Sequence, residues 1–515
     1  MCTLRSAVPR LVLAAALALP GTAAAKTPWV LSDEGRRALA AVSADALRGH
    51  LSFLASDALG GRVNGSPGLD VSAEYVASRM RAAGLEPLGD DGYFQTAPAV
   101  VAVPSAAGFR FSVSTPEGAV EIPPEEFQMT TVEAVSVADT EMVKVSPGQP
   151  PDVDAIAGRV VLTELEEIPP GPGRREAYSA RQRWTRELLA ARPALVVALA
   201  RGVAAPTGYF DAPTLIEPAS ATRPPGRVVT TPSADLARLY AALPTARPVG
   251  RLTLSVAEPR RQPTSLRNVA GLLRGSDPAL SGTYVLVTAH YDGTGPRPGA
   301  TGPDRIWNGA NDDGSGTSTV VELAAALARL RPRPRRSIVF LTFFGEEKGL
   351  LGSAYYAAHP LVPLEKTVAD VNLEHLGRTD SLEGHDKAGT ASLTGYDFSD
   401  LPRVFEAAGR ETGVEVYEDA RRSAPFFAAS DNYPLAAAGV VAHTVCVVFE
   451  DFADYHGAGD EWTKIDFPNL ERTARMVGAA VLMLADAVEE PRWREGAADA
   501  APYREAWQRR RGGGT

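Results

Sequence analysis

The 515-residue sequence is poor in cysteine and lysine, and these shortages limit what the chain can be. Two cysteines, Cys2 and Cys446, cannot supply the disulfide framework of a small secreted scaffold. Six lysines and a net charge of -10 argue against a nucleic-acid partner, and prolines separate the arginines at 331–336. No apolar run reaches the roughly 20 residues that a membrane-spanning helix requires, so we expect no integral membrane segment.

The first residues carry the pattern of a secretory signal. Two arginines accompany a short apolar run at 11–19, and small residues at 23–25 offer a cleavage site. We therefore predict that residues 1–25 are a signal peptide and that the mature protein is exported, to the periplasm or outside the cell. Cys446 would then have no cysteine partner, and its apolar surroundings predict a buried, unreactive thiol.

The length of the chain predicts two domains. The segment 101–262 is rich in proline and in β-forming residues, so we interpret it as a β-rich domain inserted into a catalytic domain. The tail from 492 to 515 is predicted to be disordered. The predicted division is a signal peptide at 1–25, the catalytic domain at 26–100 and 263–491, the inserted domain at 101–262 and the tail at 492–515.

Short apolar runs alternate with helical patterns in the second half of the chain. The predicted strands are 284–289, 338–344, 368–373 and 440–449, and the predicted helices are 318–330, 351–358, 401–412 and 470–487. Such alternation is typical of an α/β fold with a mostly parallel central sheet and helices on both faces. In open sheets of this kind, ligands gather at the carboxyl ends of the strands.

Acidic and histidine side chains follow the predicted strands. They are His290 and Asp292, then Asp312 and Asp313 before a helix, then Glu346 and Glu347, then Glu374 and His375, and finally His456. Adjacent carboxylates such as Glu346 and Glu347 suit a division between a general base and a metal ligand. A set of His, Asp and Glu without Cys is expected of a hydrolytic zinc centre that stays partly open.

Each motif also has a simpler interpretation. Taken alone, His290 and Asp292 fit a hydrogen-bonded pair at a strand end, and Asp312 or Asp313 fits a helix cap. Several such groups at strand ends or in the loops that follow favour one shared site over unrelated surface features.

The motifs AHYDGTG, NGANDDGSG, FFGEEKGLLGS, NLEHLGR and DYHGAGDEW together resemble metallopeptidase family twenty-eight, the co-catalytic di-zinc aminopeptidases. The segments LSFLASDALGGRVNGSPG and AAGLEPLGDDGYFQ resemble the amino-terminal region of that family, and the insertion resembles a protease-associated domain. The resemblance implies a fold of the di-zinc exopeptidase type. It also implies a zinc-dependent metallo-aminopeptidase that hydrolyses peptides.

The resemblance further implies a role for each site residue. It assigns one zinc to His290 and Glu374 and the other to Glu347 and His456, with Asp312 bridging both. Glu346 becomes the general base, and Asp292 accepts the second ring N–H of His290. The peptide between Asp312 and Asp313 is expected to be cis. The expected cofactors are two Zn²⁺ ions per chain, with Co²⁺ or Mn²⁺ as substitutes.

Position 374 departs from the family pattern, because Glu stands where the family most often has Asp. The neighbouring His375 is rejected as a ligand, since successive residues on a strand point to opposite faces.

The surplus carboxylates at Glu346, Glu347 and Glu374 would attract a free substrate amine, which favours an aminopeptidase. The aromatic residues Phe426, Phe427 and Tyr433 are candidates for the wall of an apolar side-chain pocket, with a core role as the alternative.

Three other functions remain open. A carboxypeptidase of the same fold needs an Arg that grips the terminal carboxylate, and Arg378, Arg421 and Arg422 are available. A glutaminyl cyclase shares the fold but uses a reduced ligand set around one zinc. A receptor-like, non-catalytic homologue loses ligands, whereas this chain keeps them.

Overall fold

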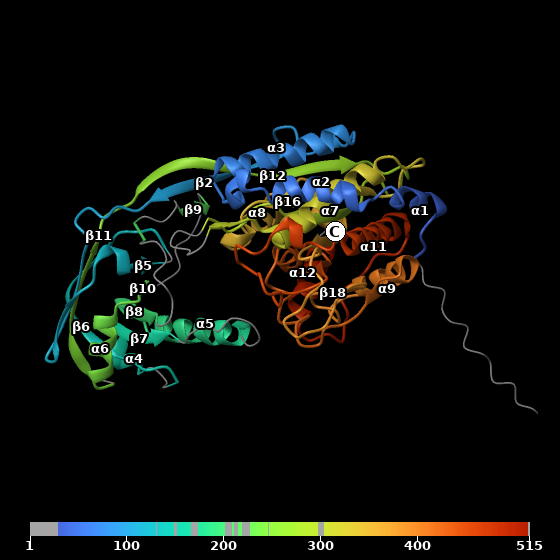
Figure 1. The fold of residues 1–515 in the computed structure, drawn as a ribbon. Coiled ribbons are helices and arrows are strands. Elements are labelled where there is room, and N and C mark those ends of the chain that lie inside the picture. Colours follow the sequence, from blue (N-terminus) through green and yellow to red (C-terminus); the bar gives the residue numbers. More distant parts are fainter. Residues whose placement is uncertain are drawn as a thin grey trace, which may run out of the picture.

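The computed structural model describes residues 29–129, 131–148, 152–165, 174–200, 209–210, 215–218, 227–245, 247–296 and 303–512. Two large β-sheets and one small two-stranded sheet are present in the described residues. Figure 1 shows two bodies joined by the long strands β2 (Phe94–Val103) and β12 (Arg260–Leu273). The predicted signal peptide at 1–25 lies outside the described residues. Within the described part of the chain, no helix combines the length and the apolar character needed to cross a bilayer.

The larger sheet has a parallel core. Its strand order is β19-β18-β20-β17-β13-β16-β12-β2-β9, with β1 (Glu86–Pro87) paired to β12. The parallel strands are β13 (Tyr284–His290), β16 (Ser337–Phe343), β17 (Thr367–Leu373) and β20 (Ala442–Cys446). The outer strands are β18 (Thr390–Leu393), β19 (Glu415–Val416) and β9 (Leu215–Pro218). The pairs β12–β16 and β18–β20 are antiparallel, so the predicted parallel sheet is confirmed for its centre.

Helices cover both faces of this core. Almost every residue of the four central strands is buried, as expected of strands covered on both sides. One group packs around α7 (Ser315–Leu327) and α11 (Phe467–Asp486), and it includes α1 (Asp33–Leu39), α2 (Ala44–Leu54), α3 (Pro67–Ala82) and α9 (Leu401–Thr412). The other group is α8 (Leu351–Ala358), α10 (Asn432–Ala437) and α12 (Ala501–Gly512).

Apart from β9, the strands between β2 and β12 form a second sheet with its own apolar core. Its strands, in spatial order, are β4 (Gly118–Glu121), β3 (Arg110–Thr115), β11 (Pro248–Val256), β6 (Val135–Lys144), β7 (Val160–Leu165), β8 (Leu195–Ala200), β10 (Val228–Thr231) and β5 (Gln128–Met129). The helices α4 (Val153–Ile156), α5 (Arg174–Ala190) and α6 (Ala234–Ala242) belong to the same segment. The insertion is therefore rich in strands and also contains helices.

The prediction of a disordered tail is wrong for residues 501–512, which form α12. Tyr503 of this helix lies 4.9 Å from Phe427 and 5.4 Å from Trp493 between ring centroids, and Trp493 is buried. These aromatic contacts stabilise the helix through burial of large apolar rings. The prediction of disorder relied on the arginine and glycine content of the tail and did not consider the packing of its few aromatic residues.

Candidate metal centre

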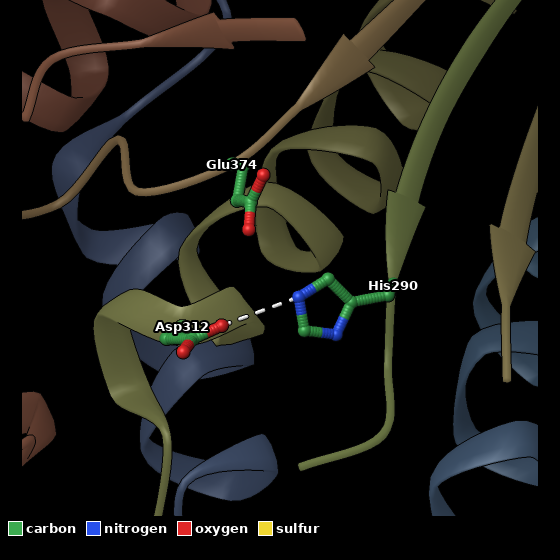
Figure 2. A group of neighbouring side chains, drawn as sticks. All are labelled: His290, Asp312 and Glu374. Atoms are coloured by element: carbon green, nitrogen blue, oxygen red, sulfur yellow. Dashed lines mark ion pairs between the residues drawn. The ribbon is translucent and has the colours of Figure 1, made fainter. Parts of the chain in front are cut away.

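The ends of the parallel strands deliver the predicted site residues to one place. His290 is the last residue of β13, and Glu374 directly follows β17. Glu346 and Glu347 come after β16, where Gly345 has a positive φ of 70° that turns the chain sharply at the strand exit. Figure 2 shows His290, Asp312 and Glu374 pointing toward one another from separate elements.

Two groups of donor atoms meet at Asp312. His290, Asp312 and Glu374 form one group, and Asp312, Glu347 and His456 form the other, with the donor atoms of each group within 4.8 Å of one another. Asp312 Oδ1 lies 3.2 Å from His290 Nε2, whereas Asp312 Oδ2 lies 3.1 Å from His456 Nε2. Asp312 thus presents one oxygen to each group, which is the arrangement that a bridging carboxylate needs.

The residues present fit a pair of metal ions. Nε2 of His290 and Nε2 of His375 are buried, and neither has a hydrogen-bond partner. Buried polar atoms without partners are costly unless another group, such as a metal ion, satisfies them. Nitrogen and oxygen donors without sulfur suit zinc, and a group of three protein donors leaves a position open for water or substrate.

Asp292 links His290 to the loop that carries the two glutamates. Its Oδ1 lies 3.4 Å from His290 Nδ1. The backbone N–H groups of Glu346 and Glu347 donate to its two oxygens at 3.1 and 3.3 Å, and Asn64 Nδ2 donates at 2.7 Å. Asp292 therefore fixes the position of the glutamate loop as well as facing the imidazole, a second task that the sequence alone did not reveal.

Glu346 belongs to neither donor group, but its carboxylate lies close to the first one. Its Oε2 lies 4.0 Å from His290 Nε2, and it lines the same cavity as the donor residues. Burial raises the pKa of Glu346 well above its usual range, against an opposing effect of His290. A carboxyl group that lies beside the donor groups without belonging to either can accept a proton from a water bound there, as a general base must.

The turn before α7 is held by residues whose roles the sequence did not indicate. Asp460 accepts hydrogen bonds from the backbone N–H groups of Asn311 and Asp312, at 2.9 and 3.1 Å. The fully buried Arg62 donates to the carbonyl oxygens of Asn308 and Gly309. The peptide between Asp312 and the next residue is cis, as the resemblance implied. Arg62 lies in a segment noted only for its family resemblance, and only the fold brings it to the turn.

A cavity of about 600 Å³ opens beside the donor groups. Its apolar wall includes Phe426, Phe449 and Tyr455, and the rings of Phe426 and Phe449 lie 5.2 Å apart. Phe426 was predicted to line such a pocket. Phe427 is instead a core residue, buried against Phe398 at 4.9 Å. Phe449 was assigned to the predicted strand 440–449, but β20 ends at Cys446, so Phe449 lies in the loop that follows. Tyr455 lies further along the same loop, whose path the sequence does not define.

His375 faces the metal centre, so the prediction that it points away from Glu374 is wrong. β17 ends at Leu373, before both residues, and His375 has a positive φ of 54°. The alternation of side chains holds only within a strand, and it does not extend past Leu373. As a result, Glu374 and His375 both line the cavity. Cys446 also lines it, and this thiol is buried with a pKa raised by burial.

The three arginines considered for carboxylate recognition have other partners. Arg378 pairs with Asp380 and Asp454, at 2.6 and 2.8 Å. Arg421 and Arg422 both pair with Glu383. Among the described residues that line the cavity, none is an arginine or a lysine.

The part of the chain that carries both donor groups is similar to known peptidases. Residues 268–481 match the model of Peptidase family M28. Aminopeptidase YwaD of Bacillus subtilis (strain 168) is 38% identical over 94 residues, which are 18% of this chain and 18% of that protein. A probable zinc metalloprotease of Pyrenophora teres f. teres (strain 0-1) is 28% identical over 246 residues, which are 44% of this chain and 50% of that protein.

Solved structures share the fold over most of the chain. An aminopeptidase from Aneurinibacillus sp. strain AM-1 has a TM-score of 0.59 at 20% identity, covering 88% of this chain and 97% of that one. A zinc aminopeptidase from Bacillus subtilis has a TM-score of 0.54 at 20% identity, covering 87% of this chain and 97% of that one. The chain spans between 8% and 50% of the length of the curated relatives it matches.

Proposed function

We propose that this chain is an exported, zinc-dependent aminopeptidase that removes N-terminal residues from peptides. The observation that carries the proposal is the sharing of Asp312 between two donor groups beside a cavity of about 600 Å³. The complete donor set supports two zinc ions per chain, one held by His290, Asp312 and Glu374 and the other by Asp312, Glu347 and His456. Export rests on the signal-like pattern of residues 1–25.

Zinc bound in such a pair of sites activates water and polarises the scissile carbonyl. The protein supplies the remaining chemistry. Glu346 takes the proton from the attacking water and passes it to the leaving amine, because its carboxyl lines the cavity beside the donor groups and belongs to neither of them. Asp292 keeps Glu346 in place through the backbone N–H of that residue. The apolar wall at Phe426 and Phe449 receives the side chain of the N-terminal residue.

The charge of the cavity favours an aminopeptidase over a carboxypeptidase. Glu346, Glu347 and Glu374 line it and attract the free amine of a substrate. A carboxypeptidase requires a cation for the terminal carboxylate. Arg378, the candidate nearest in sequence to Glu374, is engaged by two aspartates. The full donor set also argues against a glutaminyl cyclase with one zinc and against a non-catalytic homologue that has lost ligands.

The test is a panel of chromogenic substrates assayed on the purified protein with added zinc. The panel contains aminoacyl derivatives, carboxyl-terminal derivatives and a peptide with N-terminal glutamine. We expect release from the aminoacyl derivatives, with preference for apolar side chains, and no release by the Glu346→Gln variant. Cleavage confined to carboxyl-terminal substrates, cyclisation of the glutamine peptide, or no turnover of any substrate would each reject the aminopeptidase proposal.

A further inference from the structure

We propose that His375 is the fourth protein ligand of the metal site formed by His290, Asp312 and Glu374. The proposal rests on metal binding at the proposed centre and not on the aminopeptidase reaction itself. It assigns a ligand that the resemblance does not imply, and it makes the two metal sites unequal.

His375 is held rigidly at the edge of the centre. Its backbone carbonyl accepts hydrogen bonds from the N–H groups of Val447 and Val448, at 3.3 and 3.4 Å. Its ring packs edge-on against Phe452 and Tyr455, with centroids 5.5 and 5.6 Å away. These contacts and its positive φ direct the ring toward the cavity.

Nε2 of His375 lies close to two donors of that site. His375 Nε2 is 3.6 Å from Asp312 Oδ1 and 3.8 Å from Glu374 Oε1. His290 Nε2 is 3.2 Å from the same Asp312 oxygen. Donor atoms bound to one tetrahedral zinc at about 2.0–2.1 Å lie roughly 3.4 Å apart. His375 Nε2 therefore lies at about donor-to-donor distance from two members of the group.

His375 Nε2 is buried, and a buried ring nitrogen is expected to have a hydrogen-bond partner or a metal ion bound to it. His375 is 4% exposed, and Nε2 has no hydrogen-bond partner, whereas a satisfied core histidine would donate or accept at both ring nitrogens. His443 illustrates the satisfied case, since Thr394 and Ser399 contact its two nitrogens at 2.6 and 2.7 Å.

The consequence is an asymmetric centre. With His375, the first group offers four protein donors, which is the number found in closed zinc sites. The second group offers three donors, Asp312, Glu347 and His456, and leaves a position open. We infer that water and substrate bind on the side of Glu347 and His456, and that the first site holds its metal more tightly.

The inference is tested with the full-length protein by metal titration. His375→Leu removes the donor and keeps an apolar side chain against Phe452 and Tyr455. Phe452→Leu is the matched control, because it disturbs the same packing and removes no donor. Metal content, competition with a chromogenic chelator and the absorption spectrum of the Co²⁺-loaded protein are measured for each variant.

We expect His375→Leu to lower the metal affinity of the tighter site. The loss should exceed the roughly 10–100-fold seen when a residue that only orients a metal ligand is removed. We also expect its Co²⁺ spectrum to change, while the control keeps wild-type affinity and spectrum. Unchanged affinities and an unchanged spectrum in His375→Leu would overturn the proposal, even if turnover fell. An equal change in Phe452→Leu would also overturn it, because packing would then be the cause. None of the three readouts requires aminopeptidase activity, so failure of this proposal is distinguishable from failure of the proposed function.

Discussion

The backbone N–H of Glu346 donates a hydrogen bond to Asp292 Oδ1 at 3.1 Å. Asp292 also faces His290 and accepts a hydrogen bond from Asn64, so one buried carboxylate connects a predicted metal ligand to the predicted general base. The relative position of the first donor group and the predicted base therefore depends on a residue that does not line the cavity.

Replacing Asp292 should impair both functions that it connects. Asp292→Ala removes the acceptor for the Glu346 N–H and leaves that buried donor unsatisfied. We expect turnover to fall and the affinity for zinc to weaken by about 10–100-fold, as for other residues that orient metal ligands. Asp499→Ala, an exposed acidic residue, is the control and should behave as wild type. Wild-type kcat and metal affinity in Asp292→Ala would contradict the positioning role.

Glu346 and Glu347 should respond differently to the same substitution. Glu346→Gln removes the proton acceptor and keeps the donor groups, so kcat should fall by about 10²–10⁴-fold with metal content unchanged. Glu347→Gln replaces an anionic donor with a weaker neutral one, so metal content should fall and excess zinc should partly restore turnover. Metal analysis beside kcat for both purified variants separates the roles. Equal metal loss in the two variants would overturn the assignment.

His443 should make stability depend on pH below neutrality. Burial lowers its pKa to about 4, whereas an unfolded histidine titrates near 6.5. Between these values the unfolded chain binds a proton that the folded chain does not, so stability falls as the pH falls. We expect a loss of about 2 kcal/mol between pH 7 and pH 5 from this group.

Urea unfolding of the wild type and of His443→Gln at both pH values isolates that contribution. The variant is less stable at neutral pH. It has no imidazole that could bind a proton on unfolding, so its stability should depend less steeply on pH. Identical pH dependence in the two proteins would show that His443 is not buried in its neutral form.

The sequence predicted the parts of the fold that depend on local pattern. The apolar run at 284–289 became β13, and the helices predicted at 351–358 and 401–412 have the observed bounds of α8 and α9. Long periodic segments carry this information because burial repeats along them with the period of the element.

The sequence could not predict features that depend on where an element ends. His375 was placed on the wrong side because β17 stops at Leu373, two residues earlier than the alternation argument required. In the sequence, Asp460 was visible only as one letter of the motif DYHGAGDEW. In the structure it accepts a hydrogen bond from the backbone N–H of Asp312, 148 positions away. Such contacts come from tertiary structure and leave no local pattern.

Removal and return of metal tests the central claim most directly, with Asp312→Asn measured beside the wild type. Asp312 is the residue shared by both donor groups, so its loss should weaken both sites. We predict two zinc ions per wild-type chain, loss of aminopeptidase turnover in a strong chelator, recovery with Zn²⁺ or Co²⁺, and depletion of both metals in Asp312→Asn. Turnover that persists in the chelator, or full metal content in Asp312→Asn, would contradict the di-metal account.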